Sequence, residues 1–310
     1  MVNGSDIVVQ TTGLTKKYGS TVALNDVSIT VHRGEIYGFV GRNGAGKTTL
    51  IRVLTGIANP TSGTFTLLGA KSKAEQKETR KHIAAMVETP ALYMNMTAHD
   101  NLRTTLILKG IKDESLIRSR LKEVGLDDVI SSSKKAKDFS LGMKQRLGIA
   151  MALLGDPELL ILDEPTNGLD PEGIREMREL LVKINKDRNI TMIISSHILG
   201  ELSKLATRFG FIDKGVIINE ISADELFNKV SKSVVIKTDN NDRAIEILGE
   251  KYPSRVTKDD NGSLHIADVA NSSEIVKLLV KSDINVVQFR EQENGLEDYF
   301  INLIGGNHHD

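Results

Sequence analysis

Residues 41–48 form a glycine-rich loop whose backbone and side chains can hold phosphate groups. Glycines let successive backbone N–H groups close around a phosphate, and the N-terminus of a following helix adds positive potential. The segment follows an apolar run and opens a helical pattern, as a P-loop must. It reads Gly41, Arg42, Asn43, Gly44, Ala45, Gly46, Lys47, Thr48, and continues with Thr49. It predicts ATP binding, with Lys47 on the β- and γ-phosphates and the Thr48 hydroxyl on Mg²⁺.

Two adjacent carboxylates offer the groups that hydrolysis of a bound nucleotide requires. Asp163 ends an apolar run at residues 158–163, and Glu164 follows it directly. One carboxylate suits the Mg²⁺ shell, and the other can orient or deprotonate an attacking water. The alternative is that the pair only ends a strand and starts a loop, but this loses weight beside a P-loop. We therefore predict Asp163 as a metal ligand and Glu164 as the catalytic base.

These residues need a sheet and helices to hold them. Apolar runs at 35–40, 158–163 and 191–195 predict buried parallel strands. Helical patterns at 46–55, 171–186 and 198–206 predict flanking helices, and Asp170 followed by Pro171 is a typical helix start. Residues 97–125 have helical periodicity with little strand character and predict an inserted helical subdomain. The fold class is therefore α/β.

A third segment, residues 139–146, carries a resemblance to a known family. It reads Phe-Ser-Leu-Gly-Met-Lys-Gln-Arg and lies shortly before Asp163. It resembles the signature of ABC ATPases, with Ser140 and Gly142 at the serine and second-glycine positions, although Leu141 and Met143 depart from the commonest form. A serine hydroxyl and backbone N–H groups at a helix N-terminus can bind a γ-phosphate.

The resemblance implies an architecture and an assembly. It implies a P-loop NTPase (RecA-like) core with an antiparallel β subdomain and an inserted helical subdomain at about 89–155, all within a nucleotide-binding domain at 1–219. In this family the signature of one protomer closes the P-loop of the other. The chain is therefore expected to form a head-to-tail homodimer around two ATP molecules and to serve a separate integral-membrane permease.

Further residues match the family in the expected order along the chain. The resemblance implies that Tyr18 stacks on the adenine and that Asp170 links the two nucleotide sites across the dimer. It also implies that His197 binds the γ-phosphate and holds the attacking water. For Tyr18 the alternative is a surface tyrosine on a strand.

Glu88 departs from the usual family pattern. Most ABC ATPases have a glutamine in the loop that joins the core to the helical subdomain, and the natural alignment places Glu88 there. A carboxylate should bind Mg²⁺ more strongly than an amide but repel the γ-phosphate. We therefore predict Glu88 as a metal ligand and part of the catalytic machinery, the alternative being an exposed loop carboxylate.

A glutamate at this position, the Phe-Ser-Leu-Gly-Met signature and a C-terminal extension together resemble the ATPases of bacitracin-resistance and lantibiotic-immunity transporters. This implies export of a peptide antibiotic from the membrane of a Gram-positive bacterium. The alternatives are an exporter ATPase for another drug, lipid or ion, and a soluble ABC ATPase that acts without a membrane partner. The single uninterrupted cassette favours the transporters.

The composition limits the classes of partner and the cellular location that are expected. The 310 residues include 40 basic and 41 acidic side chains, a formal net charge of -1, so a general nucleic-acid binder is not expected. The chain has no cysteine, which suits a reducing cytosol. No secretory signal is recognisable at the N-terminus, and no apolar run approaches the ~20 residues that span a bilayer. We therefore expect the chain at the cytoplasmic face of the membrane, held there by its permease.

Residues 220–310 have a different pattern and predict a second, accessory domain. Strand patterns at 233–238, around 254–257, at 263–267 and at 285–290 alternate with helical patterns at 244–251 and 273–280. This βαββαβ order is typical of a small ferredoxin-like domain, and a helix at 296–304 would close it.

Overall fold

The computed structural model describes residues 6–229, 232–253, 255–259, 262–266, 269, 272–293 and 296–305. The chain divides into two compact units, Met1–Ala223 and Asp224–Asp310. Within the described ranges, no helix combines the length and apolar character needed to span a membrane.

A six-stranded sheet forms the centre of the first unit, in the order β10-β9-β4-β8-β7-β6. The strands β6, β7, β8, β4 and β9 run parallel, and β10 is antiparallel to β9. All side chains of β4, β7 and β8 are buried, as expected for strands covered on both faces. The strands are β4 (Ile36–Val40), β6 (Ile83–Met86), β7 (Leu159–Asp163), β8 (Thr191–Ser196), β9 (Arg208–Asp213) and β10 (Val216–Ser222).

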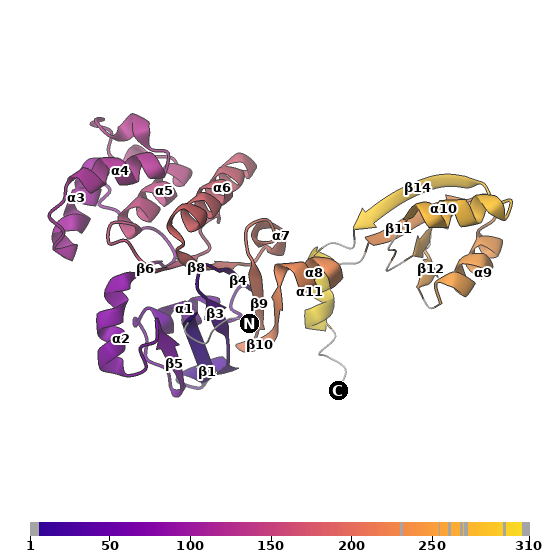
Figure 1. Ribbon diagram of the computed structural model, residues 1–310, viewed down its shortest axis with the longest axis horizontal. Helices are drawn as coiled ribbons and strands as arrows, with labels where there is room; N and C mark the ends of the chain where they lie inside the picture. Colours follow the sequence, from indigo (N-terminus) through magenta and orange to yellow (C-terminus); the bar gives the residue numbers. More distant parts are fainter. Residues whose placement is uncertain are drawn as a thin grey trace. The chain divides into compact units, whose positions relative to one another are not determined.

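Each of the three central strands leads into a helix. The helix α1 (Lys47–Leu54) follows β4, α6 (Pro171–Arg188) follows β7, and α7 (Leu199–Leu202) follows β8 (Figure 1). The prediction of a helix over 198–206 was wrong in extent, because regular helix ends at Leu202. Functional residues therefore gather where parallel strands end and helices begin, which is where ligands bind in open α/β sheets.

A smaller antiparallel sheet completes the core of this unit. It has the order β2-β1-β3, with β5 also paired to β1, and comprises β1 (Ile7–Tyr18), β2 (Thr21–Val27), β3 (Thr30–His32) and β5 (Ser62–Leu67). One cluster of buried side chains joins it to the parallel sheet through α1, and includes Val9, Leu50, Ile51 and Ile161. After β5 come α2 (Lys73–Thr79) and a short 3₁₀ helix, Arg80–His82.

Three helices form a separate group beside the sheets: α3 (Ala98–Lys109), α4 (Ser115–Glu123) and α5 (Leu141–Ala152) (Figure 1). The predicted helical stretch 97–125 is divided into α3 and α4. The break lies at Gly110, which ends α3 with a φ of 68°, a left-handed conformation that glycine adopts at little cost. At the other end, the Thr97 hydroxyl caps α3 by accepting from the backbone N–H of Asp100.

An ionic network ties α4 to the C-terminal end of α6. The Arg120 guanidinium lies 3.2 Å from Glu123 Oε2 and 2.5 Å from Asp156 Oδ1. The Arg188 guanidinium contacts both of those carboxylates, with Nη2 2.7 Å from Glu123 Oε2 and Nη1 2.8 Å from Asp156 Oδ1. Two arginines thus share two carboxylates, and the four side chains come from three segments of the chain: α4, the loop at Asp156 and α6.

The second unit has its own sheet, in the order β12-β13-β11-β14 with antiparallel neighbours. Its buried core includes Val234, Ile236, Leu248, Ile275 and Leu279. The elements after α8 (Ala223–Lys229) are β11 (Lys232–Thr238), α9 (Asn241–Lys251), β12 (Val256–Lys258), β13 (Leu264–Ile266), α10 (Ser272–Lys281), β14 (Val286–Glu293) and α11 (Leu296–Gly305).

Candidate nucleotide site

The loop between β4 and α1 has the backbone that its glycines predict. Gly44 and Gly46 have φ values of 80° and 113°. A Cβ on Gly46 would lie 2.7 Å from the Ala23 carbonyl oxygen, and one on Gly41 would lie 2.6 Å from the Ile212 carbonyl oxygen. Larger residues would therefore displace the loop. Gly46 also has no side chain to cap the first N–H groups of α1, so these groups can face a phosphate.

The remaining loop residues divide between the tip and the base. Arg42, Asn43 and Gly44 are exposed at the tip, whereas Ala45 is buried and donates its N–H to the Arg42 carbonyl at 3.1 Å. Thr49 is half-buried in the first turn of α1. The tip is therefore open to a ligand, and the base is fixed by packing.

Lys47 is held inside the loop by groups of the chain itself. Its side chain is nearly buried, with Nζ 2.6 Å from the Gly41 carbonyl oxygen and 3.2 Å from that of Arg42. Nζ also lies 3.1 Å from Glu164 Oε1. A buried ammonium needs such partners, and phosphate oxygens can take the place of the carboxylate.

The oxygen atoms of Thr48 and Asp163 meet beside Lys47. Thr48 Oγ1 donates to Asp163 Oδ2 at 2.8 Å, and Ser195 Oγ donates to Asp163 Oδ1 at 2.5 Å. A hydroxyl and a carboxylate so close together suit Mg²⁺, which takes hard oxygen ligands and completes its shell with waters and phosphates. Ser195 was not predicted from the sequence, because a serine within an apolar strand carries no motif signal.

Glu164 is positioned through both its backbone and its side chain. Its φ is 49°, an uncommon value for a glutamate, and its N–H donates to Ser195 Oγ at 2.9 Å. Its carboxylate lies 2.7 Å from His197 Nδ1 through Oε2, while Oε1 faces Lys47. The structure therefore brings together Lys47, Glu164 and His197, from the ends of three neighbouring strands.

The side chain of Glu88 is paired with Arg52 rather than with Thr48 or Asp163. Its carboxylate forms an ion pair with the Arg52 guanidinium, and both side chains are substantially exposed. Glu88 has a φ of 64°. Arg52 lies one turn after Thr48 on α1, so the pair ties the loop after β6 to the P-loop helix. Arg52 was not singled out from the sequence, although its i+4 spacing from Thr48 placed it on the same helix face.

Tyr18 lies at the β1–β2 turn, paired with Thr21. Its ring is 46% exposed, and Lys16 Nζ lies 4.7 Å from the ring centroid. An exposed ring with a neighbouring cation is available for stacking on a base, so the geometry is compatible with the predicted role.

The signature residues form a different surface. Ser140 caps α5, with Oγ accepting from Met143 N–H at 3.2 Å, and Asp170 caps α6 by accepting from Gly173 N–H at 3.0 Å. These residues and Gly142 line an open cavity of about 590 Å³ together with Arg146 and Glu176. No P-loop residue is among those that line this cavity in the described part of the chain.

Comparisons with known proteins agree with this geometry. The sequence model of the ABC transporter family matches residues 24–167. The Bacitracin transport ATP-binding protein BcrA of Bacillus licheniformis is 42% identical over 301 residues, which cover 96% of this chain and 98% of the relative. The Lantibiotic transport ATP-binding protein SrtF of Streptococcus pyogenes is 44% identical over 221 residues, which cover 69% of this chain and 93% of the relative.

This chain belongs to the ATP-binding subunits of ABC transporters. Its first unit therefore binds and hydrolyses ATP.

Solved structures of the family share the fold. CbiO1 from Clostridium perfringens, part of an ABC transporter complex, superposes with a TM-score of 0.64 at 30% identity over 72% of this chain and 91% of that one. A dimeric ATP-binding cassette in a post-hydrolysis state with ADP and Pi gives 0.62 at 25% identity, over 70% and 99%. The P-loop ABC fold predicted from the sequence is confirmed.

Proposed function

We propose that this chain powers a transporter that removes a peptide antibiotic, of the bacitracin or lantibiotic kind, from the membrane of a Gram-positive bacterium. The observation that carries the substrate class is the match to a bacitracin transport ATPase over 96% of this chain, a length that includes the C-terminal unit. The relative named for lantibiotic transport matches over 69%, which corresponds to the ATPase unit alone. Bacitracin-like peptides are therefore the first candidates.

The catalytic assignment rests on the contacts of the P-loop side. Lys47 exchanges its carboxylate partner for phosphate oxygens when the nucleotide enters, which frees Glu164 to accept a proton from water. His197 holds the other oxygen of Glu164 and fixes its direction. Thr48 and Asp163 would hold Mg²⁺, which would supply positive charge near the phosphates. Glu88, the other predicted ligand, is paired with Arg52 in this structure.

The signature side requires a second copy of the chain. Ser140, Gly142 and Asp170 line a cavity that contains no P-loop residue, so one protomer does not bring both phosphate-binding surfaces together in this structure. We propose a head-to-tail homodimer with two ATP molecules between the P-loop of one protomer and the signature of the other. Tyr18 would stack on each adenine. Closure on ATP and reopening after hydrolysis drive a separate permease, which holds this chain at the cytoplasmic face of the membrane.

We propose that the second unit is a ferredoxin-like accessory domain. The strand order β12-β13-β11-β14 and the alternation of strands and helices support this assignment. We place the domain boundary at about 219–220, whereas the compact units divide after Ala223, at the start of α8. The match to a bacitracin transport ATPase covers 96% of this chain, which supports a role for this domain in that kind of subunit.

Growth inhibition of the native host tests the proposal. Deletion of the gene should sensitise cells to bacitracin or to particular lantibiotics, and the wild-type gene should restore resistance. The Glu164→Gln variant should not restore it, because transport needs hydrolysis. The exposed Glu179 on α6 offers a matched control, because it is paired with Arg175 and does not line the signature cavity, and Glu179→Gln should restore resistance fully. An unchanged response to every peptide would refute the substrate class and leave the ATPase assignment intact.

A further inference from the structure

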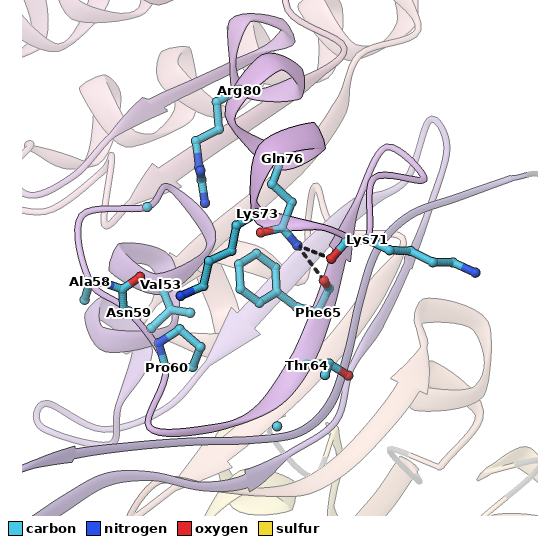
Figure 2. Close-up of a pocket in the computed structure, with 12 residues that line it drawn as sticks. Val53, Ala58, Asn59, Pro60, Thr64, Phe65, Lys71, Lys73, Gln76 and Arg80 are labelled. Carbon is cyan, nitrogen blue, oxygen red and sulfur yellow. Dashed lines mark hydrogen bonds between the residues drawn. The ribbon is translucent and has the colours of Figure 1, made fainter.

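A second pocket lies at the far end of the P-loop helix, away from the nucleotide site. It is a cavity of about 220 Å³ between the loop after α1, strand β5 and helix α2 (Figure 2). α1 is 8 residues long, so the pocket lies ~12 Å along the helix axis from Lys47. Val53, Ala58, Pro60 and Phe65 give it an apolar side. No residue assigned to nucleotide binding lines it.

Two cationic side chains converge on this pocket. Figure 2 shows Lys73 reaching from α2 toward the loop at Asn59 and Pro60, and Arg80 extending toward the same space, whereas Lys71 extends away. Among the described residues, neither Lys73 nor Arg80 has an ion-pair partner, and the lining contains no carboxylate. The pocket therefore has two cations without a carboxylate partner, Arg80 partly buried and Lys73 exposed to solvent.

Arg80 is held over the backbone in a way that leaves a donor unused. A Cβ on Gly56 would lie 2.7 Å from both Nε and Cζ of Arg80, so the guanidinium packs directly over this glycine. Its Nε is buried and has no hydrogen-bond partner. Buried polar atoms in proteins are almost always paired, so an unpaired one suggests a missing ligand.

Lys73 and Arg80 are not needed to satisfy the carbonyl groups at the C-terminal end of α1. Its last carbonyls already accept backbone N–H groups, Ile51 from Thr55 at 2.9 Å and Arg52 from Ala58 at 2.9 Å. The walls are also fixed independently of Lys73 and Arg80. The buried Gln76 side chain donates to the Phe65 carbonyl at 2.7 Å and joins α2 to β5. The pocket is thus a formed cavity whose cations are not needed to build it.

We propose that this pocket binds a phosphate group attached to a small apolar body. Two cations match the charge of a phosphate monoester, which is between about -1.5 and -2 near neutral pH. The apolar side formed by Phe65, Pro60 and Val53 accommodates the attached group, and Asn59 and Thr64 add polar groups to the lining. The phosphate belongs either to a soluble ester or to a lipid headgroup.

Calorimetry on the full-length chain tests this site. The P-loop is first filled with a non-hydrolysable MgATP analogue, so that added phosphate cannot bind there. Phenyl phosphate is then titrated into wild type, Lys73→Gln and Arg80→Lys. Removal of a charge-assisted contact should weaken binding about tenfold or more in Lys73→Gln. Arg80→Lys keeps the charge but loses the fork of donors, and should weaken it less.

Lys81 provides the matched control, because it is exposed, lies next to Arg80 and is paired with Glu78 outside the pocket. Lys81→Gln should bind phenyl phosphate as wild type does. Cosedimentation with phosphatidylcholine vesicles, with and without phosphatidic acid, identifies the source. Binding that needs both phosphatidic acid and Lys73 assigns a lipid headgroup, and phenyl phosphate binding without vesicle binding assigns a soluble ester.

Three results would overturn the proposal. Wild-type affinity in Lys73→Gln would show that phenyl phosphate binds elsewhere. Absence of binding by every phosphate probe would show that the pocket is not a phosphate site. Tighter binding of a short glutamate peptide than of phenyl phosphate would assign the pocket to an acidic protein partner. ATP turnover of Lys73→Gln should remain at the wild-type level, so the test is independent of the nucleotide site.

Discussion

The P-loop side and the signature side of this ATPase differ in how complete they are. On the P-loop side, Lys47 is nearly buried, and the side chains of Lys47, Asp163 and Glu164 have partners from the chain itself. On the signature side, Ser140 and Gly142 border an open cavity, and Leu141 beside them is 40% exposed. One surface is preorganised before the ligand arrives. In the proposed dimer, the other surface is completed only by a second copy of the chain.

Glu164→Gln should give the largest effect, because it removes the proposed base from the preorganised side. ATP turnover should fall by about 10²–10⁴-fold. ATP binding should persist, since Lys47, Thr48 and the loop are unchanged. Single-turnover hydrolysis and equilibrium binding of MgATP separate the two quantities. The control variant Glu179→Gln should match wild type in both, and equal turnover in Glu164→Gln would remove Glu164 from the catalytic role.

Mixing two inactive variants tests the division between the two sides. Lys47→Ala disables the P-loop side, and Gly142→Asp places a negative charge on the signature side. A Cβ at Gly142 fits sterically, since its nearest neighbour would be Leu169 at 3.7 Å. In a head-to-tail dimer, each mixed pair keeps one intact site, so an equal mixture should recover about a quarter of wild-type sites. ATPase assays before and after mixing measure this, and no recovery would contradict the head-to-tail arrangement.

Ser195→Ala tests how much the preorganisation of the P-loop side contributes to ATP turnover and to the stability of the fold. Its hydroxyl donates to Asp163 and accepts from the backbone of Glu164, so both carboxylate-bearing residues lose a contact. We expect turnover to fall about tenfold and the free energy of unfolding to fall by ~1–2 kcal/mol. Steady-state kinetics and urea unfolding measure the two effects. Ser196→Ala is the control, because, among the described residues, the hydroxyl of Ser196 forms a hydrogen bond only with the Ile198 N–H, which donates to it.

The Arg52–Glu88 pair should give the smallest effect, because both side chains are exposed and such pairs contribute less than about 1 kcal/mol. In Arg52→Gln the unpaired carboxylate should repel the γ-phosphate and weaken ATP binding about threefold. Glu88→Gln in the same chain should restore the affinity, so the two changes should be non-additive. Nucleotide titrations of the two single variants and the double variant complete the cycle.

The pair between Arg103 and Glu114 in the helical subdomain provides the control for that cycle, since its side chains are similarly exposed. Arg103→Gln should leave ATP affinity unchanged. Additive effects at Arg52 and Glu88 would show that their ion pair does not act on the nucleotide.

The elements that carry motifs could be predicted from the sequence, because local patterns specify them. The strand ending at Asp163, the P-loop and the cap at Asp170 all lie where their signals place them. The end of the first helix at Gly110 could also have been predicted, because a glycine within a helical pattern often marks a helix C-terminus. The contacts of Ser195 and Arg52 could not be predicted from the sequence. They join residues that lie 31 and 36 positions apart in the chain and meet only in the folded structure. Side-chain pairing of this kind depends on how the strands and helices are aligned in the fold, and no single motif encodes that alignment.

The ionic network at the end of α6 gives the molecule a mechanical property. The ion pairs among Arg120, Glu123, Asp156 and Arg188 link the helical subdomain to the C-terminal end of α6, a helix of 18 residues that is ~27 Å long. Asp170 caps the N-terminal end of the same helix, beside the signature. We therefore expect α6 to move together with the helical subdomain. In the proposed transporter, a movement that the permease imposes on the helical subdomain would shift Asp170 and the surface beside it.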